Sequence, residues 1–512
     1  MAEKGTDWSS LWKKDEWLAV WLGFLIIIFI VAGLTVKIPR FKWTTAGEFS
    51  PLATAMAPVA ETVAKSAGEK GEKALQEQAL TLKAAIDAGD RKAIGAAAKK
   101  LGDLSKAVKD AGLKRNAAKL GGDLSGESGN LAGNVFIFDN IKWIIYIGIA
   151  YLILSVIAMA LMGIPAGKFI VGFPVVFIIA AVSQFIAGNY TVLSYGLEYV
   201  IWCLILGLLV SNTIGVPEWL KPAAKTEFYI KTGLVILGAG ILFGEIVQAG
   251  AHGIVQAVLV VAVVWYLCYW IARKLQVDEE FAAILASGVS ICGVSAAIAT
   301  SGAVKGDPKK LSYVTSLVLV CAVPMMILQP VVSKALGIPD IVAGAWLGGS
   351  LDTSGSVVAA GALISETAMK TGVIVKMSQN VLIGVVAFIL AIWWTFKKGA
   401  AVPGSEKPGA IEIWYRFPKF VLGFIVASIL FSFIIDPKTV AATKGALAGL
   451  RTWWFALAFT SIGLETRFVD LAKMGGGRPV AAFLIAQIIN IFWTLLLAYL
   501  IFGGLIVAAP KL

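Results

Sequence analysis

The sequence of 512 residues has little histidine, cysteine or charge, and each scarcity excludes a class of protein. Its one histidine, His252, lies in a short Ala-Gly-Ala-His-Gly connection, so a metal site built on histidines is excluded. The four cysteines lie far apart in apolar segments without CxxC spacing, which argues against a disulfide framework and a metal cluster: Cys203, Cys268, Cys292 and Cys321. No metal or cofactor is therefore expected.

The signature motifs of nucleotide hydrolases, serine hydrolases and zinc proteases are also missing. The chain contains no GxxxxGK[ST], GxSxG or HExxH, so ATP-driven transport and membrane proteolysis by those routes are disfavoured, and we do not expect an enzyme. The net charge of +12 comes with no nucleic-acid-binding motif, and the basic residues lie mostly in short loops and in one polar segment. Membrane lipid, and not nucleic acid, is the partner that this charge predicts.

Apolar residues dominate what is present. Hydrophobic residues make up 58% of the chain against 15% charged residues, and the mean hydropathy is +0.82. At least ten apolar runs are about twenty residues long, which is the length that a helix needs to cross a bilayer. The sequence predicts an all-α polytopic membrane protein with about 11–13 transmembrane helices.

The distribution of charge and apolar runs predicts the order of the regions. Residues 17–36 are expected to form a first transmembrane helix that is retained, because no small-residue cleavage site follows it. The excess of Lys and Arg in short loops on its N-terminal side predicts that residues 1–16 are cytoplasmic. Residues 141–512, which hold the other apolar runs, are predicted to be a transporter-like membrane domain.

Residues 37–140 differ from the rest of the chain, because they are rich in Ala, Lys, Gly and Glu and too polar to span a membrane. Apolar residues recur at helical spacing on both sides of Gly89 and Asp90, which predicts an extramembrane helical hairpin. The glycine-rich stretch Gly121–Gly133 is expected to be a flexible lead into the next span.

Two stretches at membrane depth, Gly288–Gly302 and Gly348–Gly361, replace apolar residues by Gly, Ser, Thr, Cys and one Asp. Such breaks are typical of discontinuous helices whose backbone groups face a buried ligand. The alternative is that small residues here only let helices approach closely. We predict that the breaks bind substrate through Ser290, Cys292, Gly293 and Ser295 in the first, and Ser350, Thr353, Ser354 and Ser356 in the second.

Asp352 is the one acidic residue in these breaks, and an ionisable group at membrane depth is costly unless it has a partner or a function. Lys376 in the next apolar run is a candidate counter-charge and substrate ligand, and Gln379 and Asn380 are neutral donors beside it. We predict that Asp352, Gln379 and Asn380 form an ion-coupling group. The alternative is that Asp352 caps a helix at a wet entrance.

A weak internal repeat supports the same architecture. Gly238–Gly250 and Gly463–Gly475 both follow an apolar run, carry glycines at the same spacing and precede another long span. The second lies an odd number of predicted spans after the first, so the two units are expected to be inverted relative to one another.

Seven motifs in one order resemble the YeiH-type family of bacterial membrane proteins, a sulfate exporter family, from roughly Val200 to the C-terminus. The motifs are GLLVSNTIGVP (Gly207–Pro217), EFYIKTGLVILGAGILFGEI (Glu227–Ile246), SICGVSAAIA (Ser290–Ala299), AGAWLGGSLDTSGSVVAAG (Ala343–Gly361), VIVKM (Val373–Met377), FVLGF (Phe420–Phe424) and IGLETRFVDLAKMGGGRP (Ile462–Pro479). The resemblance implies a secondary transporter of the bacterial inner membrane, with inverted repeats and broken crossing helices. It is distantly similar to cation/proton antiporters and bile-acid symporters. The chain departs from the family pattern at Asp352 and Thr353, where His and Glu are expected.

These observations lead to one functional hypothesis and two alternatives. The hypothesis is a secondary transporter, with export the expected direction, that moves a small anion such as sulfate or an organic anion and is coupled to H⁺ or Na⁺. A homo-oligomer is left open. One alternative is a passive channel or facilitator for a small solute. The other is a membrane scaffold or sensor that uses the extramembrane hairpin.

Overall fold

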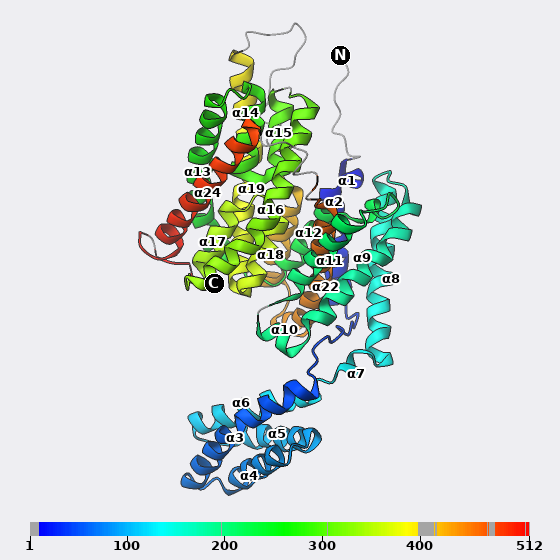
Figure 1. Cartoon of the computed structure of the whole chain (residues 1–512), viewed down its shortest axis with the longest axis vertical. Coiled ribbons are helices and arrows are strands. Elements are labelled where there is room, and N and C mark those ends of the chain that lie inside the picture. The colour runs from blue at the N-terminus through cyan, green and yellow to red at the C-terminus, as the bar shows by residue number, and fades with distance from the viewer. Residues whose placement is uncertain are drawn as a thin grey trace. The chain divides into compact units, whose positions relative to one another are not determined.

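Helices make up the regular structure of the part of the chain that is described (Figure 1). The computed structural model describes residues 10–195, 197–304, 306–397, 414, 417–467, 469, 477–506 and 508–510. The chain divides into two compact units, and their boundaries fall within helices α8, α9 and α11. One unit comprises Met1–Val36, Ala150–Ala180 and Cys203–Leu512, and the other comprises Lys37–Ile149 and Ala181–Trp202. The first is called the membrane unit below.

Seven helices in the described part of the chain are long and apolar enough to cross a membrane. They are α8 (Phe138–Leu161), α9 (Ala166–Ala187), α13 (Phe243–Lys274), the composite helix Glu279–Val304, α16 (Pro308–Ala335), α19 (Glu366–Lys397) and α24 (Arg478–Phe502). Three shorter apolar helices are α11 (Tyr199–Thr213), α18 (Ser354–Ile364) and α21 with its π-helical end η3 (Lys419–Ile429 and Leu430–Ile434). The predicted class, an all-α polytopic membrane protein, is confirmed.

The remaining helices are of two kinds. Four further helices of the membrane unit are α2 (Asp15–Val31), α12 (Thr226–Gly238), α17 (Asp340–Ser350) and α22 (Pro437–Glu465). The short ones are α1 (Ser10–Lys13), α7 (Ala132–Val135), α10 (Tyr190–Ser194) and the 3₁₀ turn η1 (Lys221–Ala223).

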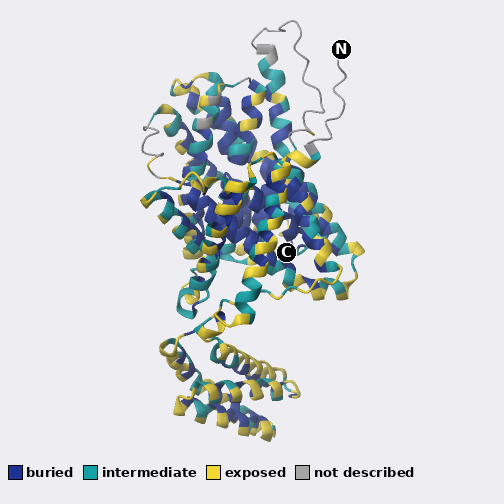
Figure 2. Cartoon of the chain, turned by 90° about the vertical axis from the view of Figure 1, so that its right-hand side faces the viewer, coloured by how far each residue is buried: buried dark blue, intermediate teal, exposed yellow. Residues whose placement is uncertain are grey.

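Two candidate spans lie deepest inside the membrane unit. The composite helix Glu279–Val304 is 78% buried over its most apolar window, and the span Glu366–Trp394 of α19 is 67% buried, whereas the other five range from 28% to 47%. Figure 2 shows buried residues concentrated inside this bundle of helices. The helices that carry most of the predicted site residues are therefore wrapped by other helices.

Both predicted breaks interrupt their helices. α14 (Glu279–Ser287) passes into the π-helical turn η2 (Gly288–Cys292), and the chain resumes as α15 (Gly293–Val304). α17 ends at Ser350, the next residues are not helical, and α18 begins at Ser354. Leu351 and Thr353 have extended backbone angles, with ψ of 135° and 147°. Each break leaves backbone groups without their usual intrahelical partners.

The predicted repeat segments lie at junctions between helices. Gly238–Gly250 contains the end of α12 and the start of α13. The second segment, Gly463–Gly475, starts at the end of α22, but residues 468 and 470–475 of it lie outside the described residues.

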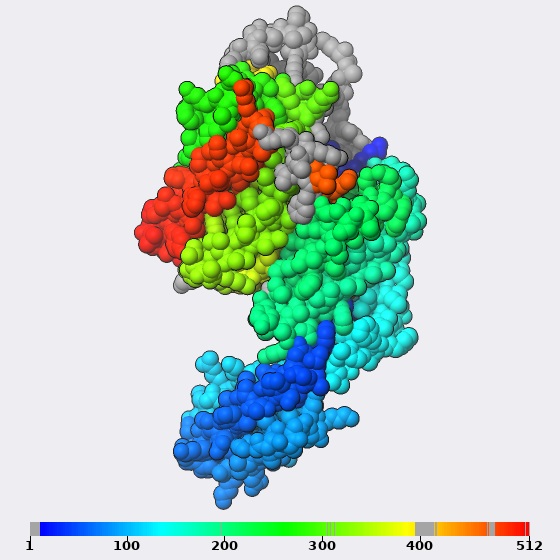
Figure 3. All heavy atoms as spheres, in the orientation of Figure 1, coloured from blue at the N-terminus to red at the C-terminus, as the bar shows by residue number. Residues whose placement is uncertain are grey.

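The segment predicted as a helical hairpin has four long helices instead of two: α3 (Ala46–Glu69), α4 (Lys73–Ala88), α5 (Arg91–Ser105) and α6 (Ala111–Gly129). The helix turn expected at Gly89 and Asp90 joins α4 to α5. The prediction missed α3, which a Thr45–Glu48 capping box starts, and α6, whose first turn is capped by Asp110. Figure 3 shows the atoms of these four helices in close contact over the visible face.

The glycine-rich stretch expected to be flexible is helical up to Gly129, so that prediction is wrong. Leu120 and Leu124 of α6 are buried in a core shared by the four helices. A Cβ atom on Gly121 would lie 2.6 Å from the Ala98 carbonyl oxygen and 2.6 Å from the Gly102 nitrogen, both on α5. Burial of the leucines and the close approach at this glycine hold the stretch as a helix.

We expect Gly121→Ala to destabilise this four-helix segment by about 1–3 kcal/mol, because the added methyl group would push α5 and α6 apart. Gly122 is the matched control, since a Cβ there would meet nothing within 4 Å. Gly122→Ala should be neutral or stabilising by about 0.5–1 kcal/mol. Hydrogen exchange of the α5 and α6 peptides in the full-length protein measures both changes. Equal protection in the two variants would show that the helices do not depend on this contact.

Candidate functional site

The two broken helices and α19 together carry all of the predicted site residues. Helix α19 packs against both α15 and α18, and α17 packs against α19 (Figure 1). The first break contributes Ser290 and Cys292 in η2, and Gly293 and Ser295 in α15. The second contributes Ser350, Asp352, Thr353, Ser354 and Ser356, and α19 contributes Lys376, Gln379 and Asn380.

Lys376 joins the two broken helices. Its Nζ atom donates to the carbonyl oxygen of Ile291 at 2.5 Å and to that of Leu351 at 2.7 Å. It also donates to Gln379 Oε1 at 2.8 Å, and the side chain is buried. Both carbonyls lie at the C-terminal end of a half-helix, where the helix dipole is negative. One ammonium group therefore stabilises the ends of two half-helices at once.

Two amide side chains repeat this arrangement. Gln379 Nε2 donates to the Ser290 carbonyl at 2.8 Å and to the Gly349 carbonyl at 3.3 Å. From α24, Asn490 Nδ2 lies 3.1 Å from the Val289 carbonyl and 3.5 Å from that of Ser350. Each of Lys376, Gln379 and Asn490 thus links one carbonyl of η2 to one at the end of α17. These three side chains are called the crossing clamp below.

The sequence analysis missed the α24 part of this site. Gln487 Nε2 donates to the Ser350 carbonyl at 2.8 Å, and Thr494 Oγ1 donates to Asn490 Oδ1 at 2.8 Å, which orients the Asn490 amide. All three of these side chains are buried. The signal was present in the sequence, because two amides three residues apart interrupt an apolar run and share a helix face.

Asp352 lies in the second break, beside the first, and has no hydrogen-bonding partner in the described part of the chain. The place where the two breaks meet is called the crossing below. The Asp352 side chain is 1% exposed, and among the described residues neither carboxylate oxygen accepts a hydrogen bond. A Cβ atom added to Gly293 would lie 3.5 Å from Asp352 Cβ, so Asp352 adjoins the start of α15. An ionised carboxylate buried in this way is costly, and the group therefore requires a proton or a cation. No three His, Cys, Asp or Glu side chains form a metal-binding group in the described ranges.

The start of α18 presents hydroxyl groups and a positive helix end. Thr353 Oγ1 accepts from the Ser356 N–H at 3.1 Å and lies 2.7 Å from Ser356 Oγ, so Thr353 caps the helix. Asn380 Nδ2 donates to Ser354 Oγ at 3.2 Å. The Thr353 cap takes up one N–H group of the first turn, and a helix start with further N–H groups and nearby hydroxyls is suited to an anion. α15 provides a second helix start at Gly293.

Other predicted hydroxyls are engaged within their own helices. Ser290 Oγ donates to the Ala286 carbonyl at 2.7 Å, and Ser350 Oγ donates to the Trp346 carbonyl at 2.7 Å. Ser295 is half-buried, and the Cys292 thiol is buried and free of disulfide bonds. The arrangement therefore separates into three parts: carbonyls held by the crossing clamp, an unpartnered carboxylate, and two half-helix starts.

Comparisons with known proteins cover the same part of the chain. Residues 171–482 match a family model described as conserved hypothetical protein 698, and this range includes all twelve predicted site residues. A UPF0324 membrane protein of Rhodopirellula baltica is 43% identical over 373 residues, which are 70% of this chain and 68% of that protein. A UPF0324 membrane protein of Nitratidesulfovibrio vulgaris is 41% identical over 358 residues, which are 68% of this chain and 62% of that protein. No solved structure matches the chain.

Proposed function

The chain belongs to the YeiH-type membrane protein family described as conserved hypothetical protein 698, and from this membership we propose that it is a secondary carrier of a small anion. The anion is sulfate or a small organic anion, its movement is coupled to H⁺ or Na⁺, and export is the expected direction. The observation that carries the proposal is the crossing of two broken helices around the unpartnered carboxylate of Asp352.

The charges at the crossing support a carrier with two kinds of ligand. The Lys376 ammonium places a positive charge at the negative ends of two half-helices, so the positive starts of α15 and α18 remain to attract an anion. Asp352 would repel that anion when it is ionised, and a bound H⁺ or Na⁺ removes the repulsion. Anion binding and cation binding at adjacent groups would then favour one another, which is the thermodynamic basis of coupling.

Lys376 is better suited to holding the crossing than to binding the substrate. Its three hydrogen bonds already go to Ile291, Leu351 and Gln379, so a bound anion would have to displace one of them. We propose that the substrate contacts come from the hydroxyls and N–H groups at the starts of α15 and α18, with Ser354 and Ser295 as the half-buried hydroxyls among them.

Purified full-length protein in liposomes tests this function. We expect accumulation of radiolabelled sulfate, or of a labelled organic anion such as a small sulfonate, only when a pH or Na⁺ gradient is imposed. Counterflow against unlabelled anion separates a carrier from a channel, because a channel cannot accumulate solute against its gradient. If the anion only flows down its own gradient and no counterflow is seen, the protein is a passive facilitator and not a carrier. No flux of any tested anion under either gradient would refute the proposal.

We place the carrier in the bacterial inner membrane with its N-terminus in the cytoplasm, as its excess of Lys and Arg in short loops on that side predicts. The four-helix segment is then outside. A Thr81→Cys variant tests this, because Thr81 is exposed on α4 whereas three of the native cysteines are buried. Labelling of intact cells by a thiol reagent that does not cross membranes is expected, and protection until the cells are opened would reverse the orientation.

A further inference from the structure

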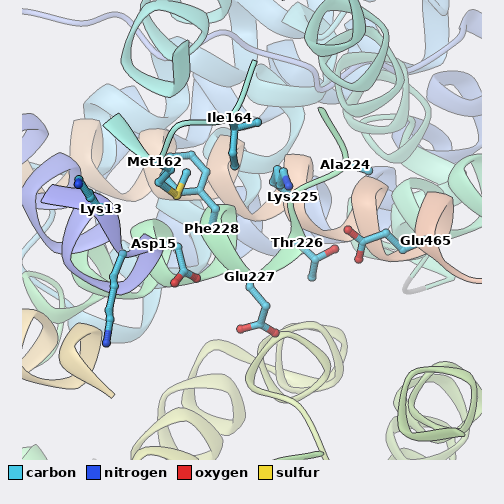
Figure 4. A pocket seen from close by; sticks show the side chains of 11 residues that line it. Lys13, Asp15, Met162, Ile164, Ala224, Lys225, Thr226, Glu227, Phe228 and Glu465 are labelled. Atoms are coloured by element: carbon cyan, nitrogen blue, oxygen red, sulfur yellow. The ribbon is translucent and has the colours of Figure 1, made fainter. Parts of the chain in front are cut away.

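A pocket of about 560 Å³ lies in the membrane unit, apart from the crossing. It is formed where α2 and α12 start, where α22 ends, and where the connection between α8 and α9 passes. None of the twelve predicted site residues lines it. Its volume is within the range of about 300–1,000 Å³ that is usual for small-molecule sites. Figure 4 shows the side chains that surround it.

Charged groups of both signs line this pocket: Lys13, Lys14 and Lys225, and Asp15, Glu227 and Glu465. In Figure 4 the carboxyl groups of Asp15, Glu227 and Glu465 lie across the middle of the view, and the Lys225 side chain lies above them. A simple anion would be attracted by the lysines and repelled by the carboxylates, and a simple cation would meet the reverse. Opposite charges side by side favour a ligand that itself carries both.

The carboxylates are only partly neutralised by the protein. Lys231 lies on α12, one turn after Glu227, with its side chain 9% exposed. Its Nζ atom is 2.7 Å from Asp15 Oδ2 and 3.7 Å from Glu227 Oε2, so one ammonium serves two carboxylates. Glu465 forms no ion pair within 4.0 Å among the described residues. The acidic part of the pocket therefore has negative charge left for an ammonium group.

A buried hydroxyl in the pocket lies against the Glu465 carboxylate. Thr226 is 8% exposed, and its Oγ1 atom faces Glu465 without a hydrogen bond of standard geometry among the described residues. Figure 4 shows the Thr226 and Glu465 side chains pointing toward one another. A carboxylate and a hydroxyl oxygen that face one another can both accept hydrogen bonds from a ligand ammonium group. Thr226 also begins α12, and its backbone N–H interacts with Glu465, so Lys225 is the group beside it that is left for the acid part of a ligand.

We propose that this pocket binds a small zwitterion, a molecule in which an ammonium group and an oxyanion are separated by a few bonds. The ammonium binds at Glu465 and Thr226, and the oxyanion binds at Lys225. Soluble amino acids and aminophosphates have this chemistry, and so does the headgroup of phosphatidylethanolamine. The pocket is a second site, and its occupancy does not depend on the carrier activity proposed above.

Helix α12 connects this pocket with the crossing. Ile230, one residue before Lys231, contacts the start of α18, because a Cβ atom on Gly355 would lie 3.4 Å from Ile230 Cγ1. A ligand that fixes the first turn of α12 would therefore restrict the contact between α12 and the start of α18, where the anion is proposed to bind. Binding in the pocket is expected to change the rate of transport without being required for it.

Phosphoethanolamine is the probe that tests the proposal, with ethanolamine and inorganic phosphate as compounds that carry one charge sign each. Full-length protein in lipid-free detergent is titrated with each compound, and thermal unfolding and calorimetry report binding. We expect phosphoethanolamine to raise the Tm and to bind at least about tenfold more tightly than either comparator, because it makes both charged contacts. Equal binding by a comparator would overturn the proposal.

Two pocket variants and two controls locate the binding. Lys225→Ala and Glu465→Gln are each expected to weaken phosphoethanolamine binding about tenfold. Lys221→Ala, in the same connection but paired with Glu218 and outside the pocket, should bind as wild type does. Asp352→Asn should also bind as wild type does, which separates this site from the crossing. Unchanged binding in both pocket variants would refute the site even if transport is confirmed.

Nanodiscs distinguish the two sources of the zwitterion. In discs of phosphatidylglycerol alone, phosphoethanolamine is expected to raise the Tm of the wild type. If the natural occupant is the lipid headgroup, adding phosphatidylethanolamine to the discs raises the Tm of wild type but not of Lys225→Ala, and phosphoethanolamine then has no further effect. If the occupant is soluble, phosphoethanolamine acts equally in both discs. Either result supports a zwitterion site, and a Tm that responds to neither compound contradicts it.

Discussion

Replacing Lys376 by methionine is expected to destabilise the protein by about 3–5 kcal/mol and to abolish transport, the largest effect of any single change at the crossing. The buried ammonium donates to the carbonyls of Ile291 and Leu351 and to Gln379. Methionine has a similar length and no donor, so three buried acceptors would lose their partner. The negative ends of two half-helices would then face one another without the ammonium group that joins them.

Lys370 is the control for this variant, because it lies on the same helix and its ion pair with Glu366 is long, at 3.6 Å. Lys370→Met should change stability by no more than about 1 kcal/mol. Thermal unfolding in detergent and flux in liposomes are measured for both variants. A Lys376→Met protein that unfolds at the wild-type temperature would show that Gln379 and Asn490 hold the crossing without it. If it also transported normally, Lys376 would have neither a structural nor a binding role.

The positions of both breaks could be predicted from the sequence, because clusters of glycine and small polar residues at membrane depth are typical of discontinuous helices. The restart of the first helix at Gly293 and the start of the second half-helix at Ser354 agree with that logic. Asp352 was also identifiable, since a lone carboxylate inside an apolar region is costly. These signals are local, and each can be recognised within a dozen residues of sequence.

The partners of these residues could not be predicted in the same way. Lys376 was expected to face Asp352, whereas its hydrogen bonds go to two backbone carbonyls, and carbonyls leave no mark in a sequence. Asn490 meets Val289 across 201 positions of the chain, a contact that no local pattern specifies. The four-helix segment was predicted as a hairpin for a related reason: its outer helices α3 and α6 contain prolines or glycines that weaken the helical pattern, and packing outweighs those propensities.

Unlike Lys376→Met, the Asp352→Asn variant is expected to fold normally. It should, however, no longer couple anion transport to an ion gradient. The carboxylate has no hydrogen bond to lose, and asparagine removes a buried charge at nearly the same volume. The Tm should therefore stay equal to that of wild type or rise. Without a group that binds H⁺ or Na⁺, the imposed gradient cannot drive accumulation, and the ratio of inner to outer anion should fall to about one.

Anion counterflow separates loss of coupling from loss of binding. The half-helix starts that are proposed to bind the anion are intact in Asp352→Asn, so exchange of labelled for unlabelled anion should persist. Asp340→Asn is the matched control, because Asp340 lies at the exposed start of α17 and its removal should leave gradient-driven uptake unchanged. If Asp352→Asn still accumulates anion, the coupling ion binds elsewhere. If it fails to fold, the carboxylate is structural, which would contradict the inference drawn from its missing hydrogen bonds. Retained exchange with lost accumulation is the outcome that assigns coupling to Asp352.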